Sequence, residues 1–165
     1  MSQRTSGAKP RSNIVAGQPV KWRVIALDRA IRPLFWSGVF RGMGVLTTTG
    51  RKTGKPRRHA VRAIRDNDRV YVVVINGKYA AWLHNLRDDP GVQIRLGGAN
   101  LKGTAHELGE GQEREEARRV YVGTVNGADY LECILHWRGL PRRWKIQKLH
   151  EMWFEGGIPL VIKLD

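Results

Sequence analysis

Short β-prone segments, several of them separated by turn sequences, place the strongest limit on how this chain can fold. They occupy residues 45–49, 60–64, 70–75, 92–96, 101–108 and 158–164. Residues 92–96 alternate apolar and polar side chains, whereas residues 70–75 are apolar throughout, as in a strand buried on both faces. Asp66-Asn67-Asp68 and residues 97–100 are hairpin-type turn sequences. The pattern predicts a mostly β (α+β) fold, a small barrel of about six largely antiparallel strands.

Helical patterns flank this β region. Residues 20–43 show apolar side chains mostly three or four positions apart with cations between them, which predicts an amphipathic helix that Pro33 kinks or ends. Shorter helices are predicted at residues 80–86 and 110–122. Residues 1–19 are polar, basic and rich in Ser, Gly and Pro, so we expect a disordered arm followed by one domain over residues 20–165.

The composition excludes several classes of protein. Cys133 is the single cysteine, so neither a disulfide framework nor a cysteine metal site is expected, and a reducing cytosol is the natural compartment. The five histidines have no ligand spacing that selects a metal. We expect neither a membrane-spanning segment nor a secretory leader, because no long apolar run and no secretory h-region occur in the sequence. No serine-hydrolase or phosphate-loop motif is found.

The positive charge is concentrated in the first part of the chain. Residues 1–65 hold 15 Lys and Arg against one acid, Asp28, whereas residues 66–165 hold 14 of each sign. An excess of this size indicates an anionic partner, and nucleic acid, an anionic membrane and a phosphorylated small molecule are the candidates.

Part of this charge lies in residues 47–59, which join the first two predicted strands. The segment contains two glycines, three threonines before them, and the cations Arg51, Lys52, Lys55, Arg57 and Arg58. We expect unoccupied backbone N–H groups over residues 50–54 and converging cations, an arrangement that binds phosphate or carboxylate groups. A solvated basic hairpin would have the same composition, and DNA backbone binding uses the same chemistry.

A second candidate lies on the short predicted helix. Trp82 and Asn85 are three residues apart and therefore share a helix face. An indole plane beside a side-chain amide suits a flat heterocycle. Trp82 as an ordinary core residue is the competing interpretation.

Five segments together resemble the deazaflavin-dependent nitroreductase family: residues 46–58, 73–77, 81–86, 89–94 and 158–162. The resemblance covers roughly half of the chain, and its most specific part is the TTGRKTG segment followed, in order, by Trp82 and Asn85. It implies a split β-barrel that binds the deazaflavin coenzyme F420, with FMN as the alternative cofactor.

The resemblance also assigns cofactor-binding residues. Arg51, Lys52, Thr53 and Arg57 would hold the phosphate and oligoglutamate tail. Arg58, His59, Ala60 and Val61 would run beneath the deazaflavin ring. Val74, Ile75, Asn76 and Gly77 would line the ring edge, and Trp82 and Asn85 would close the pocket. The cofactor supplies the hydride in such enzymes, so no acid or base side chain is assigned to the transfer.

The chain departs from the family pattern in three places. Ala60 replaces a proline, the stretch between Asn76 and Trp82 is short, and residues 129–154 are unusually rich in Trp and Arg. Tyr130 and His136 lie in this last stretch and are candidates for substrate contact, with a structural role as the alternative.

These observations favour an F420H₂-dependent oxidoreductase acting on a quinone, an enone or a nitro compound. A non-catalytic deazaflavin- or lipid-binding protein of the same fold is the alternative, and a nucleic-acid-binding protein is third. Residues 20–43 suit contact with an anionic membrane, and packing of this helix on the barrel or on a second subunit is the alternative. The expected location is the cytoplasm, at the inner face of the cell membrane if the membrane contact forms. A homodimer is implied by the resemblance alone.

Overall fold

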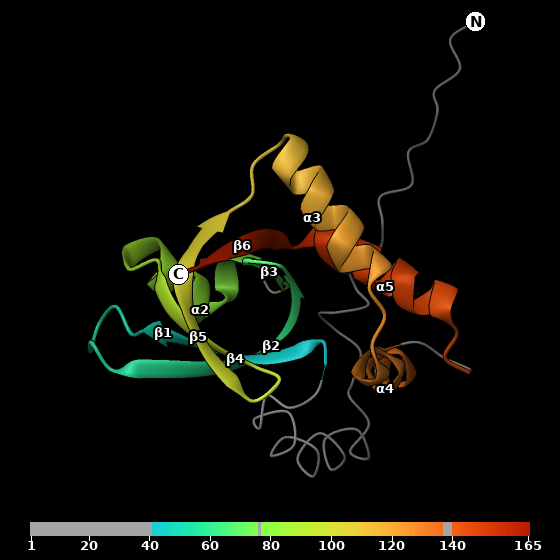
Figure 1. The fold of residues 1–165 in the computed structure, drawn as a ribbon, viewed down its shortest axis with the longest axis horizontal. Coiled ribbons are helices and arrows are strands. Elements are labelled where there is room, and N and C mark those ends of the chain that lie inside the picture. The colour runs from blue at the N-terminus through green and yellow to red at the C-terminus, as the bar shows by residue number, and fades with distance from the viewer. Residues whose placement is uncertain (1–40, 76, 137–139) are drawn as a thin grey trace, which may run out of the picture.

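The computed structural model describes residues 41–75, 77–136 and 140–165. Six strands, β1 (Met43–Thr49), β2 (Pro56–Asp66), β3 (Arg69–Val74), β4 (Gly91–Leu96), β5 (Ala99–Glu107) and β6 (Ile158–Leu164), form a closed barrel. A 3₁₀ turn (Gly77–Tyr79) and α2 (Ala81–Asp88) follow β3, whereas α3 (Gln112–Gly123), α4 (Gly127–His136) and α5 (Arg143–Gly156) lie between β5 and β6 (Figure 1). The predicted arm and most of the predicted helix over residues 20–43 lie outside the described residues.

Every neighbouring pair of strands in the barrel is antiparallel, in the order β1-β2-β3-β6-β5-β4. The predicted α+β fold built on a split barrel of six strands is therefore confirmed. None of the helices in the described ranges is both long and apolar enough to cross a bilayer.

Strand β3 is apolar on both faces because it separates two hydrophobic clusters. Val72 and Val74 point into the barrel with Leu46 and Ile162, while Tyr71 and Val73 face the opposite side. The outer cluster is completed by residues of α3 and α5: Ala117, Tyr121 and Phe154. Figure 1 shows these two helices together beside β3 and β6. The prediction of a strand buried on both faces is confirmed for residues 70–74, whereas Ile75, at 36% exposed, lies just after the strand.

The turns and ends of the elements differ slightly from the sequence prediction. Strand β1 begins at Met43, so the prediction that the N-terminal helix extends to residue 43 is wrong. Gly42, just before the strand, has a φ of 90°. Only Gly97 and Gly98, with φ of 56° and 84°, form the β4–β5 turn, because residue 99 already pairs in β5. Glycine adopts such positive φ angles without the strain that a Cβ imposes.

Helices α2 and α3 confirm the predicted helical segments, but α4 and α5 were not predicted. Helix α5 buries Ile146, Leu149, Trp153 and Phe154. These positions follow the three- and four-residue spacing of an amphipathic helix, so the signal was present within the Trp- and Arg-rich stretch.

Candidate functional site

The turn between β1 and β2 is held by its own backbone hydrogen bonds. The N–H of Gly50 donates to the carbonyl of Lys55 at 2.9 Å, and the N–H groups of Thr53 and Gly54 donate to the carbonyl of Gly50 at 3.0 and 2.7 Å. Gly54 has a φ of 64°, a conformation that favours glycine. The turn therefore presents its side chains from a fixed backbone.

The same bonds overturn one expectation. The prediction of a concave array of unoccupied N–H groups over residues 50–54 is wrong, because at least four of the five N–H groups already donate hydrogen bonds. Gly50, Thr53 and Gly54 donate within the turn, and the N–H of Arg51 donates to Oδ1 of Asn85 at 3.3 Å. Any anion at this turn must therefore be held mainly by side chains.

Most of those side chains carry a positive charge and are exposed to solvent, and we call residues 50–57 the cationic turn. All the predicted tail-binding residues are exposed: Arg51, Lys52, Thr53 and Arg57, with Lys55 and Arg58 beside them. Within the described ranges, no carboxylate forms an ion pair with Arg51, Lys52, Lys55 or Arg57. Uncompensated cations on a fixed turn attract a polyanion.

Asn85 joins helix α2 to this turn. Its Nδ2 donates to Oγ1 of Thr48 at 3.1 Å, while its Oδ1 accepts the bond from Arg51. Asn85 and Thr48 are 6% and 1% exposed. The amide predicted to close the pocket is therefore engaged in positioning the cationic turn.

His59 and Trp82 form the aromatic part of the site. Their ring centroids lie 6.1 Å apart with planes tilted by 32°, and Trp82 also packs against the barrel core. The Nε2 atom of His59 is buried and has no hydrogen-bond partner among the described residues. Burial, and then the charge of Arg57, lower the pKa of His59, so its ring is neutral at pH 7. A buried, unpartnered ring nitrogen is a polar atom that a ligand could satisfy.

The remaining predicted ring-binding residues divide into exposed and core positions. Arg58 and Ala60 are exposed on β2, and Ile75 is 36% exposed just after β3, near Gly77 in the 3₁₀ turn. Val61 and Val74 are instead buried in the barrel core, so their side chains support the site from within. Asn76 lies outside the described residues.

A groove of about 470 Å³ adjoins the cationic turn without containing the predicted residues. It starts at Gly54 and Pro56 and crosses β1, β4 and β5. Two carboxyl-bearing residues, Asp89 and Asp165, line it together with Lys102. Because carboxylates repel an anionic ligand, the cationic turn is the better place for one.

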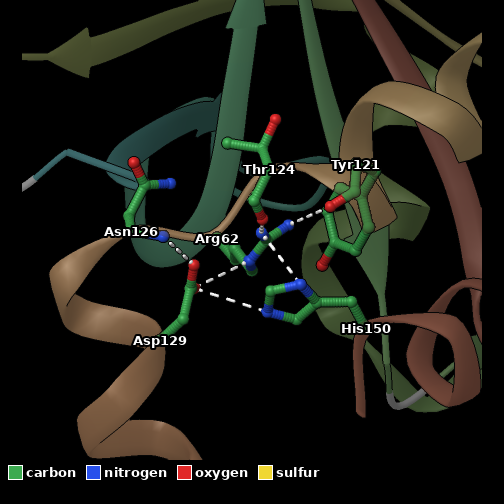
Figure 2. Close-up of polar contacts among 6 residues, drawn as sticks. All are labelled: Arg62, Tyr121, Thr124, Asn126, Asp129 and His150. Carbon is green, nitrogen blue, oxygen red and sulfur yellow. Dashed lines mark hydrogen bonds and ion pairs between the residues drawn. The ribbon is translucent and has the colours of Figure 1, made fainter. Parts of the chain in front are cut away.

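A buried polar cluster, not predicted from the sequence, connects β2 to the helices (Figure 2). Nε of Arg62 lies 3.0 Å from Oδ1 of Asp129, and its other nitrogens donate to the carbonyls of Tyr121 and Thr124 at 3.1 and 2.8 Å. Nδ1 of His150 lies 3.2 Å from Nη2 of Arg62. One strand residue thereby contacts α3, the segment after α3, α4 and α5.

The cluster contains coupled charges. Burial favours protonated Asp129, but bonds from His150, Arg62 and the N–H of Asn126 outweigh it and lower the pKa of Asp129. Burial, aided by the charge of Arg62, lowers the pKa of His150. Burial and the charge of Asp129 raise the pKa of Glu132 to about 7. No group of three metal-binding side chains able to hold an ion occurs in the described ranges.

The two candidates for substrate contact have different surroundings. Tyr130 is 41% exposed and follows Asp129, whose ion pair with Arg62 holds the start of α4 against β2 two residues from Ala60. The ring of His136 instead packs edge-on against Trp153 at 5.7 Å. Tyr130 therefore lies at the start of α4, next to the residue that pairs with β2, whereas His136 lies at the end of that helix.

Comparison with known proteins identifies relatives of this chain. Residues 36–133 match the sequence model of the F420H(2)-dependent quinone reductases. An F420H(2)-dependent quinone reductase of Mycobacterium tuberculosis is 36% identical over 88 residues, which are 52% of this chain and 58% of that protein. The match thus spans less than two thirds of the relative's length.

One solved structure shows the same fold. A protein described as a domain-swapped dimer superposes with a TM-score of 0.51 at 24% identity, over 90% of this chain and all of the other. An F420-H2 dependent reductase, FDR-A, gives a TM-score of 0.49 at 27% identity, over 76% of this chain and 95% of the other. The family match covers more than half of the sequence and includes the cationic turn, His59 and Trp82. The chain belongs to the F420H(2)-dependent quinone reductase family.

Proposed function

We propose that this protein binds coenzyme F420 and passes a hydride from its reduced form to an electron-poor acceptor, with a quinone as the principal candidate. Family membership supports the cofactor and the type of reaction. The observation that carries the proposal is that exposed cations without a carboxylate partner in the described ranges lie in the turn that leads into His59. The ring of His59 is half-buried and packs with Trp82. Such a site suits a ligand with a polyanionic tail and a flat, polar ring.

The tail contacts follow from charge. Arg51, Lys52 and Arg57 project from the fixed turn and would bind the phosphodiester and carboxylates of the F420 tail by charge-assisted hydrogen bonds. The backbone of Arg57 pairs with Thr48, the residue whose hydroxyl accepts a hydrogen bond from Asn85 of α2. FMN carries a single phosphate, for which this many cations are unnecessary.

The ring contacts follow from shape and hydrogen bonding. The His59–Trp82 pair offers an aromatic surface. Ala60 follows His59 on β2, so its small, exposed side chain points to the other face of the strand. The unpartnered Nε2 of His59 is a hydrogen-bonding atom of the kind that a deazaflavin carbonyl or ring N–H would satisfy. Because the His59 ring is neutral, it can serve as donor or acceptor according to its tautomer.

The protein's contribution to the reaction is mainly binding and orientation. When bound, the reduced cofactor would supply the hydride. Tyr130 is the proposed acceptor-facing side chain, since it is exposed, follows the residue that pairs with β2, and carries both a ring face and a hydroxyl. Quinone, enone and nitro compounds all remain candidate acceptors for this surface.

The test is to mix purified protein with reduced F420 and menadione and to follow the return of oxidised-coenzyme absorbance. We expect reoxidation above the protein-free blank, and its loss in Lys52→Ala/Arg57→Ala but not in Arg119→Ala, an exposed cation on α3. Reoxidation no faster than the blank with menadione, an enone and a nitro compound, together with tight coenzyme binding, would select a non-catalytic binding protein.

Homodimerisation is a further part of the proposal. The family resemblance suggests a dimer, and a mass measured by light scattering during size-exclusion chromatography would decide it. A mass of twice 18.7 kDa is the expected value.

A further inference from the structure

Helices α3, α4 and α5 form a helical layer beside the barrel. The end of this layer where α4 leads into α5 exposes large apolar side chains. Ile134 near the end of α4, Leu140 before α5 and Trp144 in its first turn are 54%, 77% and 57% exposed. We call these residues, with Arg142 and Arg143, the α4–α5 tip. In Figure 1 the start of α5 lies at the edge of the molecule away from the barrel.

The fold does not use these side chains in its core. Helix α5 already buries Ile146, Leu149 and Trp153, and Trp144 is two residues before Ile146, which places it on the opposite face of the helix. On α4, Cys133 is buried, whereas Ile134, one position on, faces outward. Exposed apolar side chains grouped in this way mark an interaction surface.

Local contacts order the tip. Nζ of Lys145 donates to the carbonyl of Leu140 at 3.2 Å and lies 5.8 Å from the centre of the Trp144 ring. The turn before α5 is thereby fastened to the first turn of the helix, with Leu140 and Trp144 still exposed.

The charge around these side chains is of one sign. Residues 140–150 contain four cations, Arg142, Arg143, Lys145 and Lys148, and no acid. Lys148 is paired with Glu151 at 2.8 Å, but neither Arg142 nor Arg143 forms an ion pair within the described ranges. Exposed Trp, Leu and Ile beside Arg match the polar–apolar boundary of an anionic bilayer.

We propose that the α4–α5 tip docks on an anionic lipid surface, inserting Leu140 and Trp144 at the headgroup level with Arg142 and Arg143 on lipid phosphates. Charge argues against two other occupants. Residues 1–40 hold seven Lys and Arg against one acid, so they would be repelled by the tip. A second copy contacting through the same face would oppose like charges. Nucleic acid would satisfy the arginines but leave Ile134 and Leu140 in water.

The test places an environment-sensitive NBD fluorophore at Leu140→Cys in the full chain. Cys133 is 1% exposed, so labelling occurs at position 140. We expect a blue shift and brighter emission with phosphatidylglycerol-containing vesicles, little change with pure phosphatidylcholine, and no shift for a label at Gln112→Cys, at the start of α3.

Charge variants provide the matched comparison. Arg142→Gln/Arg143→Gln should weaken vesicle partitioning at least about tenfold, the scale expected when two surface cations are removed. Arg119→Gln/Lys102→Gln removes two positive charges from α3 and β5, outside the tip, and should change vesicle partitioning less than about twofold.

An unchanged emission with vesicles, or equal losses in the two double variants, would overturn the proposal. A shift produced by polyglutamate or DNA instead of vesicles would also overturn it, since it would assign the tip to an acidic protein or a nucleic acid. F420 binding is expected to be the same in all these variants, so this result is independent of the proposed reductase activity.

Discussion

Arg62 and Asp129 form an ion pair inside the protein, with Nε and Oδ1 3.0 Å apart and side chains only 3% and 0% exposed. The two residues are 67 positions apart in the chain. Their pairing holds the start of α4 against the middle of β2 (Figure 2). The same strand carries Arg57, His59 and Ala60 two to five residues before Arg62. The helical layer is therefore anchored to the same strand that carries part of the proposed cofactor site.

Removing one partner of this pair should be strongly destabilising. Asp129→Ala leaves the Arg62 guanidinium buried without its counter-charge, which we expect to lower the free energy of unfolding by about 3–5 kcal/mol. Urea denaturation measures the change. Glu155→Ala, which removes an exposed partner of Arg118, should cost less than about 1 kcal/mol. Similar losses in the two variants would show that the buried pair has no special role.

Glu132 should make stability depend on pH. Its pKa rises from 4.5 in the unfolded chain to about 7 in the folded protein, so the folded state binds the proton more tightly. The stabilisation is present below about pH 4.5 and is lost as the pH rises towards 7. The unfolding free energy of Glu132→Gln relative to wild type should therefore increase from pH 4.5 to 7.5. A pH-independent difference would contradict a raised pKa.

Asp129 and His150 should act in the opposite direction. The pKa of each is lowered on folding, so acidification protonates the unfolded state first and stability falls. For His150 the loss begins near its ordinary value of 6.5, and for Asp129 near 3.8. In His150→Gln the fall in unfolding free energy between pH 7 and 5 should be smaller than in wild type. An identical fall would argue against a neutral, buried His150.

Asn85 should connect stability to cofactor binding. Asn85→Ala leaves the N–H of Arg51 and the hydroxyl of Thr48 without their partner, a change expected to cost about 1–3 kcal/mol of unfolding free energy. Because the cationic turn loses its tie to α2, F420 affinity should fall as well. His84→Ala, on the neighbouring position of α2, is the comparison, and wild-type affinity in Asn85→Ala would count against this role.

His59 should affect binding without supporting the fold. His59→Phe keeps a ring against Trp82 but removes the buried nitrogen that has no partner in the described structure. We expect unchanged or higher stability by urea denaturation and F420 affinity about two- to tenfold weaker, the equivalent of one hydrogen bond. Unaltered affinity would mean that Nε2 does not contact the cofactor.

The strands were predictable because each carries its own periodicity. The apolar run over residues 70–75 predicted burial on both faces, which the second hydrophobic cluster confirms for residues 70–74. The turn glycines Gly97 and Gly98 marked the β4–β5 hairpin. Helix α5 was missed although Ile146, Leu149 and Trp153 follow a helical spacing.

The polar contacts of the site were less accessible to sequence reasoning. Whether the N–H of Arg51 is available depends on Asn85, 34 residues away, and the role of Arg62 depends on Asp129. Local sequence records which groups are present, whereas pairing across such separations is decided by the closure of the barrel and the packing of helices on it.

The most direct test of the proposed cofactor site is a titration of oxidised F420 into the protein, followed by quenching of tryptophan fluorescence. Trp82 lies beside His59, so a bound deazaflavin should quench its emission. We predict saturable quenching for wild type and Arg119→Ala, and affinity at least about tenfold weaker for Lys52→Ala/Arg57→Ala, which loses two charge-assisted contacts. The same quenching curve for all three proteins would contradict the assignment of the cationic turn to the cofactor.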